Sequence, residues 1–271
     1  MMYEKIDIQK NKSNLKARLD LYLWSPSEEL GTDIRRPLVI ICPGGGYSFT
    51  SEREGEPVAF KYLSRGYNAA VLWYSVTPAR YPEALHQLAL SVKYIRDNAD
   101  RLKVDPERII ISGFSAGGHL AGCLGMFWRS DFLCKELNVF PDDIRPNGMI
   151  LDYPVITSSS FCHDGSFREL LGENYDKLME GLSLENQVTE HTPKTFLWHT
   201  WDDDTVPVEN TLLLAAALRK CKVETELHIY PRGIHGLSLA NKLTMNRDGR
   251  GNEPYCEGWI DLSCQWIDNL K

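Results

Sequence analysis

The stretch Gly113-Phe114-Ser115-Ala116-Gly117 decides the fold of this chain. It follows the apolar run 109–111 and precedes small residues that suit a closely packed helix. A serine on a sharp strand-to-helix turn has a strained backbone, and a glycine two residues before and two after relieves the crowding. Such a turn directs the serine hydroxyl to solvent and places the amide of Ala116 at a helix N-terminus, where it can donate to an oxyanion. Ser115 is therefore a candidate nucleophile, the alternative being a tight turn with an idle serine.

A second glycine-rich turn, Pro43-Gly44-Gly45-Gly46-Tyr47, follows the apolar run 38–42. Three glycines leave their backbone amides uncovered and permit positive φ angles. In a fold with a strand–serine–helix turn, this loop faces the serine and supplies further oxyanion donors. A flexible turn and a phosphate loop are the alternatives, but the Lys-Ser or Lys-Thr pair that a phosphate loop requires does not follow.

A nucleophilic serine needs a base, and seven histidines compete for that role. His235 is the best placed, because it lies in a glycine-flanked loop late in the chain, and the order serine, acid, histidine is typical of this fold. The acid is expected after the apolar run 196–198, where Asp202, Asp203 and Asp204 are adjacent. A buried carboxylate would fix the imidazole tautomer, and its neighbours would cap a helix starting near Val208. The residues alone leave the choice among the three open.

Short apolar runs alternate with amphipathic segments from about residue 36 onward, which predicts an α/β fold with a mostly parallel central sheet and helices on both faces. Residues 5–8 and 15–24 alternate apolar and polar side chains, which predicts an antiparallel pair leading into the sheet. Further strands are expected at 37–42, 69–74, 109–111, 149–151, 196–198 and 227–230. Helices are expected at 57–64, 82–98, 116–128, 208–220 and 255–270.

We expect one domain over residues 1–271, with the pattern weakening at 129–147 and 155–194. These two stretches are candidate cap or loop insertions over a pocket. The composition, 43% hydrophobic and 25% charged, is that of an ordinary soluble protein. An odd count of seven cysteines without a CxxC pair argues against a disulfide framework and a zinc ribbon.

The charge and the first residues limit which partners and which location are expected. A formal net charge of −7 disfavours nucleic acid and anionic membrane surfaces as partners. No apolar run approaches the ~20 residues of a membrane span, and no secretory signal is visible, so a cytoplasmic location is expected. The oligomeric state is not readable from the sequence.

The glycine run 43–47, the stretch 113–121 and the segment 199–207 together resemble the α/β-hydrolase esterases. The nearest group is the bacterial acetyl esterase and acetyl-xylan-esterase-like branch, related to the hormone-sensitive-lipase and prolyl-oligopeptidase types. The resemblance runs from about residue 36 to the C-terminus, in order and with natural spacing. In that group the acid stands four residues before the proline of a Val-Pro pair, so Pro207 selects Asp203.

The resemblance implies a catalytic triad and an oxyanion hole, made respectively by Ser115, Asp203 and His235 and by Gly45, Gly46 and Ala116. The hormone-sensitive-lipase type opens its glycine run with His where Pro43 stands here, so the choice of inward-pointing glycine amides stays open. The implied activity is hydrolysis of short acyl esters, such as acetyl esters of sugars or xylan fragments, through an acyl-enzyme and without metal or cofactor. Tyr47 and Trp201 are candidates for stacking on a sugar ring, although ordinary packing is the more common role of such aromatics.

Other functions fit parts of the same pattern. An arylformamidase-like amidase would use the same triad. A peptidase of the prolyl-oligopeptidase type is less favoured, because the chain has no propeller-sized N-terminal region to gate peptides. A catalytically silent binding protein on the same scaffold typically loses the base, and His235 is present. The sequence does not give the acyl length or the alcohol.

Overall fold

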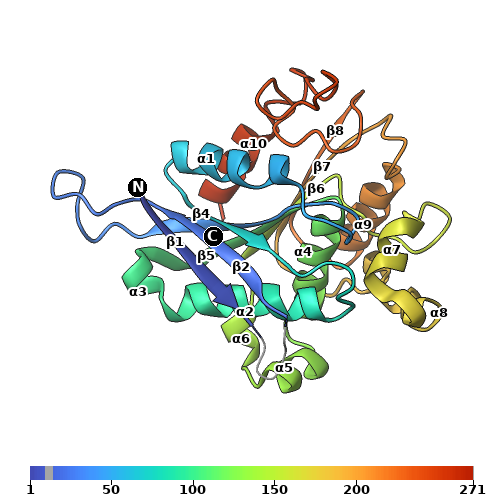
Figure 1. The fold of residues 1–271 in the computed structure, drawn as a ribbon, viewed down its shortest axis with the longest axis horizontal. Coiled ribbons are helices and arrows are strands. Elements are labelled where there is room, and N and C mark those ends of the chain that lie inside the picture. The colour runs from blue at the N-terminus through green and yellow to red at the C-terminus, as the bar shows by residue number, and fades with distance from the viewer. Residues whose placement is uncertain (10–14, 271) are drawn as a thin grey trace.

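The computed structural model describes residues 1–9 and 15–270. In this part of the chain, eight strands form one sheet in the order β1-β2-β4-β3-β5-β6-β7-β8 (Figure 1). β2 pairs antiparallel with β1 and with β4, and every other neighbouring pair is parallel. The α/β fold with a mostly parallel sheet, expected from the sequence, is confirmed. The strands are β1 Met2–Ile8, β2 Ala17–Leu23, β3 Arg36–Cys42, β4 Asn68–Trp73, β5 Val104–Phe114, β6 Gly148–Asp152, β7 Thr195–Thr200 and β8 Thr225–Tyr230.

Helices cover both faces of the sheet (Figure 1). α1 (Glu56–Ser64) and α10 (Trp259–Asp268) pack on one face. α2 (Glu83–Asp97), α4 (Ala116–Phe127) and α9 (Glu209–Lys220) pack on the other. The short helices are α3 Ala99–Leu102, α5 Asp131–Leu137, α6 Pro141–Ile144, α7 Asp164–Leu171 and α8 Tyr175–Leu178, with 3-10 turns η1 Glu52–Glu54, η2 Gly172–Asn174, η3 Glu180–Leu182 and η4 Leu184–Asn186.

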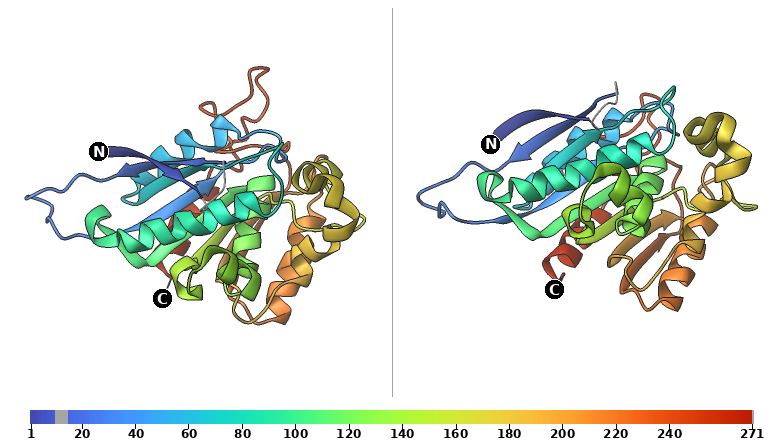
Figure 2. Two further views of the ribbon diagram at one scale, coloured as in Figure 1. Left: turned by 60° about the horizontal axis from the view of Figure 1, so that its bottom comes forward. Right: turned by 90° about the horizontal axis from the view of Figure 1, so that it is seen from below.

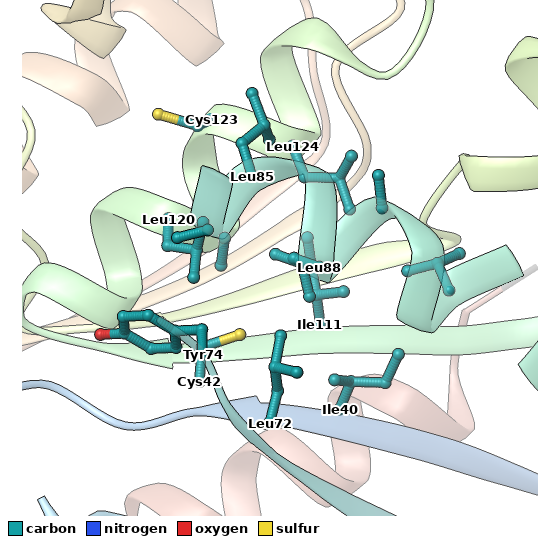
Figure 3. Packing of buried hydrophobic residues seen from close by; sticks show 14 of the residues in the cluster. Ile40, Cys42, Leu72, Tyr74, Leu85, Leu88, Ile111, Leu120, Cys123 and Leu124 are labelled. Atoms are coloured by element: carbon teal, nitrogen blue, oxygen red, sulfur yellow. The ribbon is translucent and has the colours of Figure 1, made fainter. Parts of the chain in front are cut away.

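Two apolar cores lie on the two faces of the sheet, because successive side chains of a strand point to opposite faces. In β3, Leu38 and Ile40 join the core beneath α2 and α4, whereas Val39 and Ile41 join the core beneath α1 and α10. Figure 3 shows the first of these cores, where side chains of α2 and α4 meet those of the central strands. Burial on both sides explains why the central strands read as continuous apolar runs.

The weakly patterned segments contain short helices. Residues 129–147 form α5 and α6, which pack beside α2 (Figure 2). Residues 155–194 contain α7, α8 and three of the 3-10 turns. The final helix was expected to start at residue 255, but it starts at Trp259. The preceding residues form turns, in which the amide of Cys256 bonds the carbonyl of Glu253 and that of Trp259 bonds the carbonyl of Cys256.

The carboxyl ends of the parallel strands gather the candidate site residues at one edge of the sheet. β3 ends just before the glycine run, β5 ends just before Ser115, and β7 and β8 end shortly before Asp203 and His235. In open α/β sheets this edge is where ligands bind. Within the described residues, the helices are all too short or too polar to cross a lipid bilayer.

Candidate active site

Ser115 occupies the turn between β5 and α4 with a φ of 54° and a ψ of −118°. A positive φ is unfavourable for serine, so the surrounding packing must hold it in place. A Cβ at Gly113 would lie 2.2 Å from the carbonyl oxygen of Gly117, and a Cβ at Gly117 would lie 2.1 Å from the carbonyl oxygen of Cys42. Both glycines are therefore required by the turn, as the sequence pattern indicated.

Ser115, His235 and Asp203 are brought together although they are far apart in the sequence. The Nε2 atom of His235 is 2.7 Å from the hydroxyl oxygen of Ser115. The Nδ1 atom of His235 is 2.6 Å from a carboxylate oxygen, Oδ2, of Asp203. With Nδ1–H donating to the carboxylate, Nε2 is free to accept the serine proton, which is the arrangement of a nucleophile, a base and an orienting acid.

Asp203 is buried and hydrogen-bonded on both oxygens. Its Oδ1 accepts the amides of Thr205 and Val206 at 3.0 and 2.9 Å. Its Oδ2 also lies 3.3 Å from Nε2 of His199, which donates in addition to the carbonyl of Val206. Burial by itself would raise the pKa of Asp203, but the hydrogen bonds from His199, His235 and the amide of Val206 outweigh it and hold the pKa well below its usual range. The carboxylate is therefore ionised at neutral pH.

The two neighbouring aspartates have other positions. Asp202 accepts the amide of Gly233 at 2.7 Å and so fixes the start of the loop that carries His235. Asp204 is exposed and contacts the hydroxyl of Thr205. The expectation that these neighbours cap the following helix was wrong, because Val208 is the N-cap of α9 and makes no side-chain cap bond. Of these two neighbours, Asp202 therefore anchors a loop and Asp204 faces solvent.

Gly45 and Gly46 line a cleft together with Ser115 and have φ angles of +132° and +62°. The amide of Gly44 donates to Oε2 of Glu54 at 2.8 Å and is therefore engaged. In the described part of the chain, no acceptor is hydrogen-bonded to the amides of Gly45, Gly46 or Ala116. Ala116 begins α4, where helix geometry leaves the first amides without an intrahelical acceptor. These three amides are available to an incoming oxygen.

The cleft has a volume of about 520 Å³ and is lined mostly by glycine backbone and polar side chains. Its lining residues are Gly45, Gly46, Ser48, Phe49, Ser51, Arg53, Glu54, Ser115, His163, Thr205, His235 and Gly236. None of the residues 129–147 lines it, so that insertion does not cap this cleft, whereas the insertion 155–194 contributes His163.

The aromatic side chain in the cleft is Phe49, which is 60% exposed. Tyr47 was a candidate for stacking on a sugar, but it is buried and its hydroxyl donates to Nδ1 of His119 at 2.9 Å. Trp201 is 62% exposed, and among the described residues it is not one of those that line the cleft. Sequence reasoning favoured the aromatic residue directly after the glycines. It missed Phe49, which lies two residues further on in a turn where the amides of Ser48 and Phe49 both bond the carbonyl of Gly45.

His163 is a second cleft residue that sequence reasoning missed. It is the N-cap of α7, and its Nδ1 accepts the hydroxyl of Ser166 at 2.8 Å. Burial, together with the nearby charge of His235, lowers the pKa of His163 below its usual value. A neutral imidazole is expected there at neutral pH. No local motif marks this histidine, and only the folded insertion carries it to the cleft.

Next to Ser115 lies a small, mostly apolar pocket with no room for a water molecule. It is lined by Tyr47, His119, Val155, Ser166, Phe167 and Leu170. The amides of His119 and Val155 both bond the carbonyl oxygen of Ser115 at 3.1 Å, which places these two residues directly against the serine. Burial lowers the pKa of His119 to about 4, so its imidazole is neutral and packs as part of this wall.

Comparisons with known proteins agree with the fold. Residues 19–218 match the BD-FAE family model. The chain is 40% identical over 216 residues to endo-1,4-beta-xylanase B of Butyrivibrio fibrisolvens, covering 77% of this chain and 34% of that protein. It is 32% identical over 212 residues to an acetylxylan esterase of Xylanibacter ruminicola, covering 74% of this chain and 41% of that protein. The chain thus spans well under half the length of these two curated relatives.

A solved structure covers nearly the whole chain. The acetyl ester-xyloside bifunctional hydrolase of Caldicellulosiruptor lactoaceticus is 36% identical to this protein and superposes with a TM-score of 0.83. The alignment covers 98% of this chain and 96% of that one. With the family model matching most of the sequence, the chain belongs to the BD-FAE family and has the α/β-hydrolase fold.

Proposed function

We propose that this protein is a serine carboxylesterase that hydrolyses short acyl esters, with acetyl esters of sugars or xylan fragments as its substrate class. The observation that carries the proposal is the hydrogen-bonded chain from Ser115 through His235 to Asp203, with heavy-atom distances of 2.7 and 2.6 Å. Both distances fall within the range that nucleophile activation requires.

In the proposed mechanism His235 takes the proton of Ser115 as the hydroxyl attacks the ester carbonyl. The ionised carboxylate of Asp203 stabilises the imidazolium that forms. The amides of Gly45, Gly46 and Ala116 bind the oxyanion of the tetrahedral intermediate, and a donor of this kind typically contributes about 3 kcal/mol. His235 then protonates the leaving alcohol, and a water molecule, deprotonated by the same imidazole, releases the acid from the acyl-enzyme.

The walls of the site support a short acyl group and a polar alcohol. The pocket next to Ser115 has no room even for a water molecule, so a long acyl chain would find no space there. The cleft is lined by Ser48, Ser51, His163 and Thr205, whose polar groups suit hydroxyl groups of a sugar. Phe49 is exposed and offers a ring face in the same cleft. The names of the relatives, acetylxylan esterase among them, agree with this substrate class.

Ser115→Ala tests the nucleophile. We expect kcat for p-nitrophenyl acetate to fall by about 10⁶-fold, toward the uncatalysed rate, because the covalent route is lost. The fluorophosphonate probe that labels the native protein should no longer react. Ser64→Ala, which changes an exposed serine at the end of α1, is the matched control and should leave both readouts unchanged. Turnover retained in Ser115→Ala would refute the assignment.

A substrate panel tests the proposed class. Among p-nitrophenyl esters, kcat/KM should fall steeply from acetate to butyrate to octanoate, because each added methylene must displace side chains of the small pocket next to Ser115. Acetylated xylo-oligosaccharides should be deacetylated with release of acetate. Equal rates for acetate and octanoate would contradict the short acyl pocket. An N-formylkynurenine arm separates esterase from arylformamidase activity.

A further inference from the structure

Glu54 lies in the wall of the active-site cleft, although a negative charge there opposes the negative charge that forms on the oxyanion. Its side chain is 3% exposed, and both carboxylate oxygens accept hydrogen bonds. Oε2 accepts the amide of Gly44 at 2.8 Å, and Oε1 accepts the hydroxyl of Tyr153 at 2.7 Å. A carboxylate accepts hydrogen bonds and cannot donate them, so it fixes the direction of both donors.

The first of these bonds acts on the oxyanion loop, which we define as residues 43–49. With three consecutive glycines, this loop has wide conformational freedom. The bond to Glu54 fixes the peptide unit between Pro43 and Gly44. The next unit, which carries the amide of Gly45, is held through the carbonyl of Gly44 by the amide of Ser51 at 2.9 Å. A Cβ at Gly44 would lie 2.9 Å from Oε2 of Glu54 and 3.0 Å from Cβ of Ser115, so the loop is packed between the carboxylate and the nucleophile.

The second bond leads to the histidine loop, which we define as residues 231–240. The hydroxyl of Tyr153 accepts the amide of Ser238 at 2.8 Å, and the hydroxyl of Ser238 donates to the carbonyl of Arg53 at 2.6 Å. Nη1 of Arg53 donates to the carbonyl of Gly236 at 3.0 Å. The turn η1 therefore contacts both loops, one that carries the base and one that carries the oxyanion donors.

The backbone of Tyr153 indicates independently that the surrounding structure holds this side chain in one position. Its φ is 38°, in a region that is unfavourable for a bulky residue. Strained backbone of this kind persists where the surrounding structure requires one side-chain position. Here that position is the contact with Glu54 on one side and with the ring of His235 on the other, at a centroid distance of 5.2 Å.

We propose that Glu54 is a positioning residue that, with Tyr153, holds the oxyanion loop and the histidine loop in register across the cleft. The role rests on the esterase function proposed above. Glu54 touches no reacting atom in this scheme. Through the amide of Gly44 it holds the start of the loop that carries the Gly45 and Gly46 amides, and it supports the base through Tyr153 and Ser238.

Glu54→Gln tests the proposal, because glutamine keeps the shape but can accept only one of the two bonds at its single oxygen. We expect kcat/KM for p-nitrophenyl acetate to fall about 10- to 100-fold, less than the 10²- to 10³-fold that loss of a whole oxyanion donor costs. Methylboronic acid forms a tetrahedral adduct on a nucleophilic serine, and its inhibition constant should rise by the same factor. Glu52→Gln removes the same charge from an exposed position of η1 and should behave as the native protein.

The parallel change in the two constants separates positioning from a merely structural role. A folded Glu54→Gln with native kcat/KM, or with a lower kcat/KM but an unchanged inhibition constant for methylboronic acid, would overturn the proposal. These outcomes are distinct from failure of the esterase function, which would appear as activity retained in Ser115→Ala.

Tyr153→Phe provides a second route if Glu54→Gln does not fold. It removes the hydroxyl that bonds Oε1 of Glu54 and the amide of Ser238, so kcat/KM should fall and the inhibition constant should rise, each several-fold. The double variant should lose less than the product of the two single losses, because both substitutions break the same hydrogen bond. Native constants in Tyr153→Phe, or strictly multiplicative losses in the double variant, would count against the coupled arrangement.

Discussion

Gly117→Ala is the substitution that tests the geometry of the nucleophile turn most directly. The added Cβ would lie 2.1 Å from the carbonyl oxygen of Cys42 and 2.5 Å from that of Pro43. The first contact is roughly 1.3 Å shorter than the 3.4 Å at which ordinary van der Waals contact begins. Both contacts are with backbone, so no side-chain rotation relieves them, and either α4 or the oxyanion loop must move.

The magnitude follows from that displacement. Overpacking that forces backbone shifts costs about 3 kcal/mol at the upper end of its usual range. For a chain of this size, such a loss lowers the melting temperature by roughly 6 °C. A shift of about 1 Å between Ser115 and the oxyanion amides also lowers kcat/KM by about 10²-fold.

Thermal unfolding followed by circular dichroism and p-nitrophenyl acetate hydrolysis measure the two effects. Gly181→Ala is the matched control, because a Cβ at Gly181 meets nothing within 4 Å. It should change stability by less than about 0.5 kcal/mol and leave activity intact. If Gly117→Ala melts and turns over like the native protein, the close approach of α4 to the oxyanion loop is not what fixes the site.

Three further predictions concern single side chains. Asp203→Asn should lower kcat by about 10⁴-fold in the same assay, because an amide NH₂ facing His235 favours the wrong imidazole tautomer; a loss below tenfold would refute that role. Burial raises the pKa of Asp152 well above its usual range, so the native state binds a proton that the unfolded chain releases. Stability is then lost as the pH rises past about 4, and Asp152→Asn should raise the melting temperature at pH 8 but not at pH 4; a pH-independent difference would contradict this. Phe49→Ala should raise KM about fivefold for acetylated xylo-oligosaccharides while leaving ethyl acetate hydrolysis unchanged, since only the sugar can stack; equal effects on both substrates would exclude stacking.

The central strands were predictable from the sequence, because a strand that is buried on both faces has a continuous run of apolar residues, as in 37–42. Strand ends were less accurate. The run at 109–111 marks only the middle of β5, which extends from Val104 to Phe114. Its first half contains Asp105, Pro106 and Glu107, which carry no strand signal and lie where the pairing with β3 is irregular, between Val104 and Ile109. The short helices of the two insertions were not predicted, because their stability comes from packing on larger elements rather than from periodicity.

Residues whose role depends on local backbone geometry were found from the sequence, and residues brought in by packing were not. The glycines around Ser115 predict the turn from the sequence, because no other residue fits the space there. Glu54 and His163 have no such signature, since their positions depend on where a 3-10 turn and an inserted helix pack. His199 is a buried histidine at the end of β7, and it donates to Asp203 as well as to the carbonyl of Val206.

The strain at Ser115 is held by the fold rather than by the catalytic side chains. Its amide donates to the carbonyl of Asp152 at 3.0 Å, and its carbonyl accepts the amides of His119 and Val155. A positive φ at a non-glycine residue costs about 1–3 kcal/mol, and these three bonds oppose its release by tying both backbone polar groups of the serine to α4 and to the end of β6. Removing His235 or Asp203 would therefore leave the nucleophile in place. A change in the packing beneath β6 would displace the nucleophile without altering any residue of the triad.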